Sequence, residues 1–174
     1  MLTKSVKSVI SVVLKHVARA KNPCNRCFII SDPDRYLDIE HFATVKPAVN
    51  QIETHIFQQQ KTAKEYLKKY GCQIESWGPF AEGRKDMFTN PVLTKIGAKY
   101  GKTAAQTALR FLLQSDVVVI PKSVHKDRIQ QNFELFDFTL SPEDMAAIEA
   151  LDEGESLFFS HYDPKTVEWF MSIL

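Results

Sequence analysis

The stretch that decides the fold reads Val117-Val118-Val119-Ile120-Pro121-Lys122-Ser123-Val124-His125-Lys126-Asp127-Arg128-Ile129-Gln130-Gln131-Asn132. Its first four residues form an apolar run, which is typical of a strand buried on both faces in a parallel sheet. Helical spacing follows, and we expect Ser123 at the start of that helix. Helix N-termini present unpaired N–H groups that suit a phosphate, and Lys122 and Arg128 add two positive charges. The stretch therefore predicts a strand, a phosphate-binding loop and a helix.

Signals for strands and helices alternate along the rest of the chain. Apolar runs predict strands at residues 28–31 and 117–120, and residues 48–53 and 72–77 are two further strand candidates. Helical spacing predicts helices at residues 34–42, 61–70, 91–100, 103–113, 125–135 and 141–151. Two of these helices open with a capping residue followed by proline, Asn90-Pro91 and Ser141-Pro142. The alternation indicates a parallel α/β architecture, and the aromatic residues 153–174 are expected to form an irregular tail.

The composition is that of a soluble globular protein. The chain has 174 residues, of which 44% are hydrophobic and 25% are charged, and its formal net charge is +1. No apolar run approaches the roughly 20 residues that span a bilayer. We therefore expect neither a membrane nor a nucleic acid as a partner. An odd, small number of cysteines (3) fits a reducing compartment, so we expect a cytoplasmic location.

Residues 1–27 differ in charge from the rest of the chain. They carry six basic side chains and no acid, which leaves residues 28–174 net acidic. Residues 3–20 have the spacing of an amphipathic helix. This composition fits either a mitochondrial transit peptide or a leader from a truncated or frame-shifted gene. Cys24-x-x-Cys27 is a weak signal for a redox pair or half of a zinc site, since no second pair accompanies it.

Residues 120–132 closely resemble the NADP-binding signature of the aldo-keto reductases. Further motifs resemble this family in the same order: residues 46–55 its sixth strand, residues 75–81 its seventh strand and loop, and residues 136–141 the stretch before its last helix. The resemblance covers about residues 33–170. It implies a partial (β/α)8 TIM barrel, about the last four β/α units, with a non-family N-terminal helical segment. The expected parts are a leader (1–27), the C-terminal half of the barrel (28–152) and a tail loop (153–174).

The resemblance also implies a site for NADP(H) in preference to NAD(H). Four residues would surround the 2′-phosphate: Lys122, Ser123, Val124 and Arg128. Two would contact the adenine, Gln131 and Asn132. Gln51 would hydrogen-bond the nicotinamide amide and Trp77 would stack on its ring. The backbone around the pyrophosphate would come from Gly78, Pro79 and Phe80, and Ile120 completes the cofactor-binding set. Without the resemblance, a Lys-Ser pair at a helix start is usually a cap, and a Trp at a strand end is usually part of the core.

The resemblance also indicates which residues the chain lacks. In the family a Tyr, tuned by a Lys and an Asp, protonates the carbonyl oxygen, and a His orients the substrate. All four lie in the first half of the barrel, and we expect this chain to begin after them. No Tyr here has an Asp five positions before it, and Ser31 and Asp32 do not fall at the family's Ser-Asn positions. We therefore assign no catalytic residue.

Two functions stay open. One is an NADP(H)-dependent carbonyl reductase that acts on a small-molecule carbonyl substrate when another half is supplied. The other is a non-catalytic, nucleotide-binding remnant or structural half barrel. A half barrel would expose two strand edges, which invite self-association.

Overall fold

The computed structural model describes residues 27–28, 33–160 and 162–173. The amphipathic helix expected over residues 3–20 lies outside them, as do Cys24 and the Ser31-Asp32 pair. Among the described residues, every helix is too short or too polar to span a lipid bilayer.

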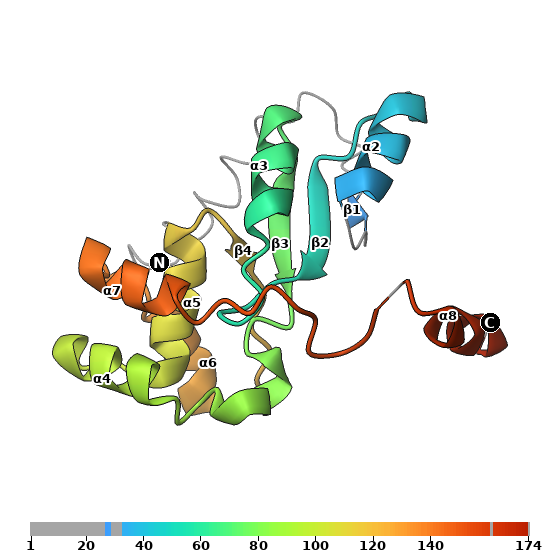
Figure 1. The fold of residues 1–174 in the computed structure, drawn as a ribbon. Helices are drawn as coiled ribbons and strands as arrows, with labels where there is room; N and C mark the ends of the chain where they lie inside the picture. The colour runs from blue at the N-terminus through green and yellow to red at the C-terminus, as the bar shows by residue number, and fades with distance from the viewer. Residues whose placement is uncertain (1–26, 29–32, 161, 174) are drawn as a thin grey trace.

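Within the described residues the strands form one four-stranded parallel sheet in the order β1-β2-β3-β4 (Figure 1). The strands are β1 (Cys27–Phe28), β2 (Val49–Glu53), β3 (Gln73–Trp77) and β4 (Val118–Val119). The longest pairing joins β2 to β3, where Gln51 lies opposite Glu75. Because each strand pairs with its neighbour in sequence, the expected parallel α/β architecture is confirmed.

Helices lie between these strands and after the last of them. They are α2 (Pro33–Phe42), α3 (Lys61–Lys69), a 3-10 segment η1 (Ala81–Asp86), α4 (Pro91–Tyr100), α5 (Ala104–Gln114), α6 (Lys126–Phe133), α7 (Pro142–Glu149) and α8 (Pro164–Ser172). Both predicted caps form. The Asn90 side chain accepts from the N–H groups of Val92 and Leu93, and the Ser141 hydroxyl accepts from the N–H of Asp144. The pattern-based helices therefore begin where the capping residues place them.

The two faces of the sheet differ in chemistry. In β2 and β3 alternate side chains are buried, and Ile52 and Ile74 join the apolar core formed with α3 and α5. The intervening residues Gln51, Glu75 and Trp77 are only partly buried. One face of the sheet therefore packs on helices, and the other presents polar and aromatic side chains.

Two expectations were wrong. Residues 117–120 are not a strand buried on both faces: β4 covers two residues, both partly buried, and Ile120 is 56% exposed. Since β4 is the last strand of the sheet, it pairs only with β3 in the described part of the chain. Residues 153–174 are not wholly irregular either, because α8 forms there. Asp163 caps its first turn and Pro164 occupies its first position.

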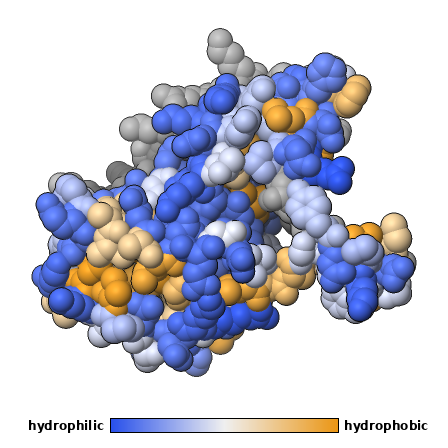
Figure 2. Space-filling view, viewed as in Figure 1, coloured by the Kyte–Doolittle hydropathy of each residue, from blue (hydrophilic) through white to orange (hydrophobic). Residues whose placement is uncertain are grey.

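Helix α8 lies apart from the sheet and its covering helices (Figure 1). Figure 2 shows it as a separate lobe that carries both polar and apolar surface. No residue of α8 is buried, and Trp169 and Met171 are 58% and 70% exposed. The helix is capped by Asp163, and its Phe170 ring contacts Phe159 of the tail with ring centres 5.2 Å apart.

The tail between α7 and α8 is tied to the end of β2. The Glu53 carboxylate accepts from the Ser156 hydroxyl at 2.5 Å and from the N–H of Leu157 at 2.9 Å. His55 Nδ1 accepts from two backbone N–H groups, so its Nε2 carries the proton and donates to Glu53 at 2.9 Å. The Gln59 amide donates to the carbonyl of Ile148 at the end of α7. Several hydrogen bonds therefore hold the tail across the carboxyl end of β2.

The Glu53→Gln variant tests this attachment. Burial acts to raise the pKa of Glu53, but hydrogen bonds from His55, Ser156 and Leu157 outweigh it and hold the pKa below its ordinary value. A lowered folded-state pKa stabilises the protein above the ordinary pKa, and this contribution is lost as the pH falls through the folded value. We expect Glu53→Gln to lower the free energy of unfolding at pH 7 by about 1–3 kcal/mol. Urea titrations at pH 7 and pH 3 should show the difference from wild type shrinking in acid.

The control is Glu155→Gln, which removes an exposed carboxylate from the same tail. It should leave the urea midpoint within error of wild type. A Glu53→Gln difference as large at pH 3 as at pH 7 would contradict the ionised hydrogen-bond network.

Gly97 lies where α4 is close to the start of α5. A Cβ at this position would lie 2.5 Å from the carbonyl oxygen of Lys102 and 2.8 Å from the Thr107 hydroxyl oxygen. Both distances are shorter than a non-bonded contact allows, and the first neighbour is backbone. Gly97 therefore permits the tight turn that joins α4 to α5.

Gly97→Ala is expected to reverse the usual helix rule. In an open helix Ala stabilises relative to Gly by about 1 kcal/mol. Here the added methyl would displace Lys102, and we expect a net loss of about 1–3 kcal/mol in chemical denaturation. Thr94→Ala, an exposed change in the same helix, should stay within about 0.5 kcal/mol of wild type. A raised midpoint for Gly97→Ala would refute the close packing.

Candidate functional site

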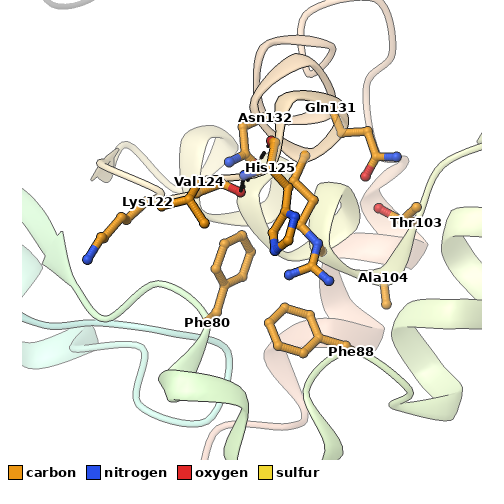
Figure 3. Close-up of a pocket in the computed structure, with 12 residues that line it drawn as sticks. Phe80, Phe88, Thr103, Ala104, Lys122, Val124, His125, Gln131 and Asn132 are labelled. Atoms are coloured by element: carbon orange, nitrogen blue, oxygen red, sulfur yellow. Dashed lines mark hydrogen bonds between the residues drawn. The ribbon is translucent and has the colours of Figure 1, made fainter.

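A cavity of about 600 Å³ opens between the start of α6 and the segments that lead into α4 and α5 (Figure 3). Its lining brings together seven of the residues singled out from the sequence: Phe80, Lys122, Ser123, Val124, Arg128, Gln131 and Asn132. The structure adds five that sequence reasoning missed: Phe88, Thr103, Ala104, Ala105 and His125. Residues as far apart in sequence as Phe80 and Asn132 thus surround one space.

One wall of the cavity is cationic, since the exposed side chains of Lys122 and Arg128 line it. The exposed His125 lines the same wall. In Figure 3 the His125 ring points from the start of α6 toward the two phenyl rings. None of the described lining residues is acidic. The wall is therefore suited to an anion, and an Arg there can hold a phosphate through two hydrogen bonds.

We expected Ser123 to start the helix, and this expectation was wrong. Its hydroxyl oxygen accepts from the N–H of His125 at 3.1 Å, which forms a tight turn ahead of α6. The helix begins at Lys126, and His125 occupies the capping position without a side-chain cap bond. The loop thus includes Ser123, Val124 and His125, and His125 lines the cavity.

The opposite wall is aromatic. The rings of Phe80 and Phe88 lie 5.4 Å apart, centre to centre, at an interplanar angle of 55°. Phe88 remains 52% exposed although it is a large apolar side chain. Gly83, with φ of 78°, turns the chain between them. Flat apolar faces on this wall are suited to a flat ring system.

Helix α5 forms the base and fixes α6. Its first turn is closed by a capping box: the Thr103 hydroxyl accepts from the N–H of Gln106, and the Gln106 side chain accepts in return from the N–H of Thr103. The Gln106 amide donates to the carbonyls of Gln131 and Glu134 at 3.2 and 3.3 Å. The end of α6 is therefore hydrogen-bonded directly to the start of α5.

The remaining predicted residues do not line the cavity. Ile120 is largely exposed. The Gln51 amide donates to the Glu75 carboxylate across the β2–β3 pair at 2.7 Å. Trp77 packs edge to face against Phe158 of the tail, with ring centres 4.6 Å apart. Gly78, with φ of 64°, also faces Phe158, and Pro79 is buried.

Contacts with the tail cover the region around Trp77 and Gly78. The Arg84 guanidinium lies 4.2 Å from the centre of the Phe158 ring and donates to the carbonyl of Leu157. Lys85 forms an ion pair with Glu153. Segment η1 is thereby connected to the tail, and Phe158 of the aromatic tail lies against Trp77. Its position depends on a contact between segments about 80 residues apart.

Comparison with known proteins gives one consistent result. The model of the "Aldo/keto reductase family" matches residues 30–153. The glyoxal reductase of Bacillus subtilis (strain 168) is 46% identical over 113 residues, which are 65% of this chain and 40% of that protein. The methylglyoxal reductase DkgA of Escherichia coli (strain K12) is 42% identical over 113 residues, 65% of this chain and 41% of that protein.

Solved structures agree. The aldo-keto reductase MGS-M4 from a Medee basin deep-sea metagenome library superposes with a TM-score of 0.72 at 36% identity, over 78% of this chain and 49% of that one. A variant of Gox0644 in complex with NADPH gives 0.70 at 35% identity, over 75% of this chain and 48% of that one. The chain spans about two fifths to one half of the length of these relatives. With the family model matching well over half of its residues, the chain belongs to the aldo/keto reductase family.

Proposed function

We propose that this chain is the NADP(H)-binding half of an aldo/keto reductase barrel, corresponding to about its last four β/α units. The observation that carries the proposal is the single cavity formed by Lys122, Arg128, Asn132 and their neighbours. Parallel strands that pair in sequence order are what part of a (β/α)8 barrel would contain. In such barrels the loops after the last strands are a frequent phosphate site.

The cavity fits the cofactor in charge and in shape. A 2′-phosphate carries negative charge, and Lys122 and Arg128 would hold it between an ammonium and a guanidinium group. Phe80 and Phe88 offer apolar faces for a flat ring. A related protein, the Gox0644 variant, has been solved in complex with NADPH. These features together favour NADP(H) over NAD(H), which lacks the 2′-phosphate.

The proposed reaction is reduction of a small carbonyl compound by the complete barrel. When bound, NADP(H) supplies the hydride for this chemistry. The residues of this chain would bind and orient the cofactor: Lys122 and Arg128 at the phosphate, Gln51 and Trp77 at the nicotinamide. The substrate class follows relatives named glyoxal and methylglyoxal reductases. General acid catalysis needs a positioned proton donor, and we propose that the Asp, Tyr, Lys and His of the family are not among these residues.

The alternative function is that of a nucleotide-binding chain without catalytic activity. The two candidates differ in turnover. NADPH oxidation with glyceraldehyde, followed by absorbance, should give no rate above background for this chain alone. A robust rate that Lys122→Ala abolishes would overturn the assignment of no catalytic residue.

NADPH binding is the direct test of the proposed site. Titration with NADPH should saturably quench tryptophan fluorescence, since Trp77 is one of two tryptophans and lies at the proposed site. Arg128→Ala should weaken binding about tenfold or more, because it removes a charged hydrogen-bond donor from the phosphate. Arg35→Ala removes the same charge from the exposed surface of α2 and should bind like wild type. Absence of saturable binding by wild type would refute the proposal.

We also propose that the chain self-associates. Strand β4 pairs with β3 alone in the described residues, and the face that carries Gln51, Glu75 and Trp77 is not covered by the helices of the core. Exposed strand edges favour pairing with another chain. Size-exclusion chromatography with light scattering should report a dimer or larger species. A compact, stable monomer of 19.9 kDa would contradict this proposal.

The cytoplasmic location stays a prediction.

A further inference from the structure

Segment η1 has a strained backbone. Four of its non-glycine residues adopt positive φ angles between 48° and 53°: Ala81, Glu82, Lys85 and Asp86. This left-handed conformation is sparsely populated for residues with a Cβ, and it persists only where surrounding contacts impose it. The middle of the segment is exposed, whereas Ala81 and Met87 at its ends are fully buried. The contacts made by the exposed middle therefore decide whether the strained backbone is kept.

The exposed middle of η1 is held by the tail segment, residues 153–158. The Arg84 guanidinium lies 4.2 Å from the centre of the Phe158 ring and donates to the carbonyl of Leu157. Lys85 forms an ion pair with Glu153. Two adjacent residues of η1 thus contact both ends of the tail segment.

The other side of the tail segment is attached to β2 and to the residues that follow it. The Glu53 carboxylate accepts from the Ser156 hydroxyl at 2.5 Å and from the N–H of Leu157 at 2.9 Å. The N–H of Glu153 donates to the carbonyl of Phe57 at 2.8 Å. Glu53 makes no hydrogen bond or ion pair with η1 in the described part of the chain. The tail segment is therefore the link between Glu53 and η1.

Segment η1 in turn supports the aromatic wall of the cavity. The carbonyl of Phe80, which directly precedes it, accepts from the N–H of Gly83 at 2.9 Å. The Phe88 ring packs on Gly83, where a Cβ would lie 3.3 Å from the ring. Figure 3 shows the Phe80 and Phe88 rings next to each other at the cavity, and their centres are 5.4 Å apart. A change in the backbone of η1 would therefore displace this wall.

We propose that the tail segment is a latch: it holds η1 in its left-handed conformation, so that the two segments open and close as one unit. In the closed state Phe158 lies against Trp77, and Phe80 and Phe88 form the cavity wall. Release of the tail segment lets η1 relax to ordinary φ angles, and the wall opens. The latch goes beyond the proposed function, because it operates without a ligand. Only its response to NADPH rests on the proposed function.

Hydrogen exchange of the full chain, followed by mass spectrometry, tests the latch. Glu53→Gln weakens the attachment of the tail segment to β2 at a residue that does not contact η1. It should speed exchange about fivefold or more in the tail segment, and by the same factor in residues 81–88, because both open together. In an Arg84→Ala/Lys85→Ala background the same substitution should speed exchange in the tail segment alone. Faster exchange confined to the tail segment without that background would overturn the proposal.

Two controls separate the latch from general destabilisation. Glu155→Gln removes an exposed carboxylate from the same tail segment and should leave exchange in both segments unchanged. Gly97→Ala destabilises the chain away from the latch, so local opening of the two segments should also stay unchanged. A rise in both segments as large for Gly97→Ala as for Glu53→Gln would mean that they open only with the whole fold, and this would refute the latch.

A second variant covers the case in which Glu53→Gln fails to fold by circular dichroism. Ser156→Ala removes one hydrogen bond to the Glu53 carboxylate from an exposed position of the tail segment. It should speed exchange about twofold or more in the tail segment and in residues 81–88 alike. A rise in the tail segment alone would again count against the latch.

NADPH provides a reciprocal test. The tail segment does not line the cavity, yet a ligand that favours the closed wall should also favour the closed latch. Saturating NADPH should therefore slow exchange about threefold or more in the tail segment as well as in residues 81–88. Protection of residues 81–88 without the tail segment would overturn the latch. If NADPH does not bind, the proposed function fails, and the Glu53→Gln comparison still decides the latch.

Discussion

The proposed site depends on a polar stripe along the otherwise buried helix α5. Gln106, Arg110 and Gln114 recur every four residues, so they share one face of the helix. Gln106 donates to the carbonyls of Gln131 and Glu134. Arg110 donates to the carbonyl of Leu135 and to the hydroxyl of Thr139. Gln114 donates to the carbonyl of Leu140. Because the rest of α5 is fixed in the core, these bonds set where α6 and the segment after it lie. Helix α5 therefore fixes the position of the cationic wall of the cavity.

The tail fixes the other end of the proposed site, near Trp77. Glu53 accepts from Ser156 and Leu157, while Arg84 covers the Phe158 ring and binds the backbone beside it. The tail thereby lies between β2 and η1, with Phe158 against Trp77. Hydrogen bonds to the Glu53 carboxylate hold the tail near Trp77, whereas hydrogen bonds from the side chains of α5 hold α6 beside the cavity. The two ends can therefore respond differently to pH and to mutation.

Much of the fold follows from local signals. Asn90, Thr103 and Ser141 stop and start helices through their own side chains, and the alternating burial of β2 and β3 follows from their sequence pattern. Where burial depended on a neighbour, the pattern misled: residues 117–120 are apolar, yet β4 is short and Ile120 exposed because one side of that strand is unpaired in the described residues. The tail helix α8 was missed although Asp163-Pro164 is the same pattern of a capping residue followed by proline that opens α4 and α7.

The sequence by itself determined the family, the parallel α/β architecture and the basic residues of the cavity, since those lie within one short stretch between Ile120 and Asn132. Only the tertiary structure decided that Phe88 and the start of α5 complete that cavity, that His125 faces it, and that Phe158 covers Trp77. The physical reason is separation along the chain. A capping bond or a charge cluster forms between near neighbours, whereas these contacts exist only after the sheet, helix α5 and the tail have packed together.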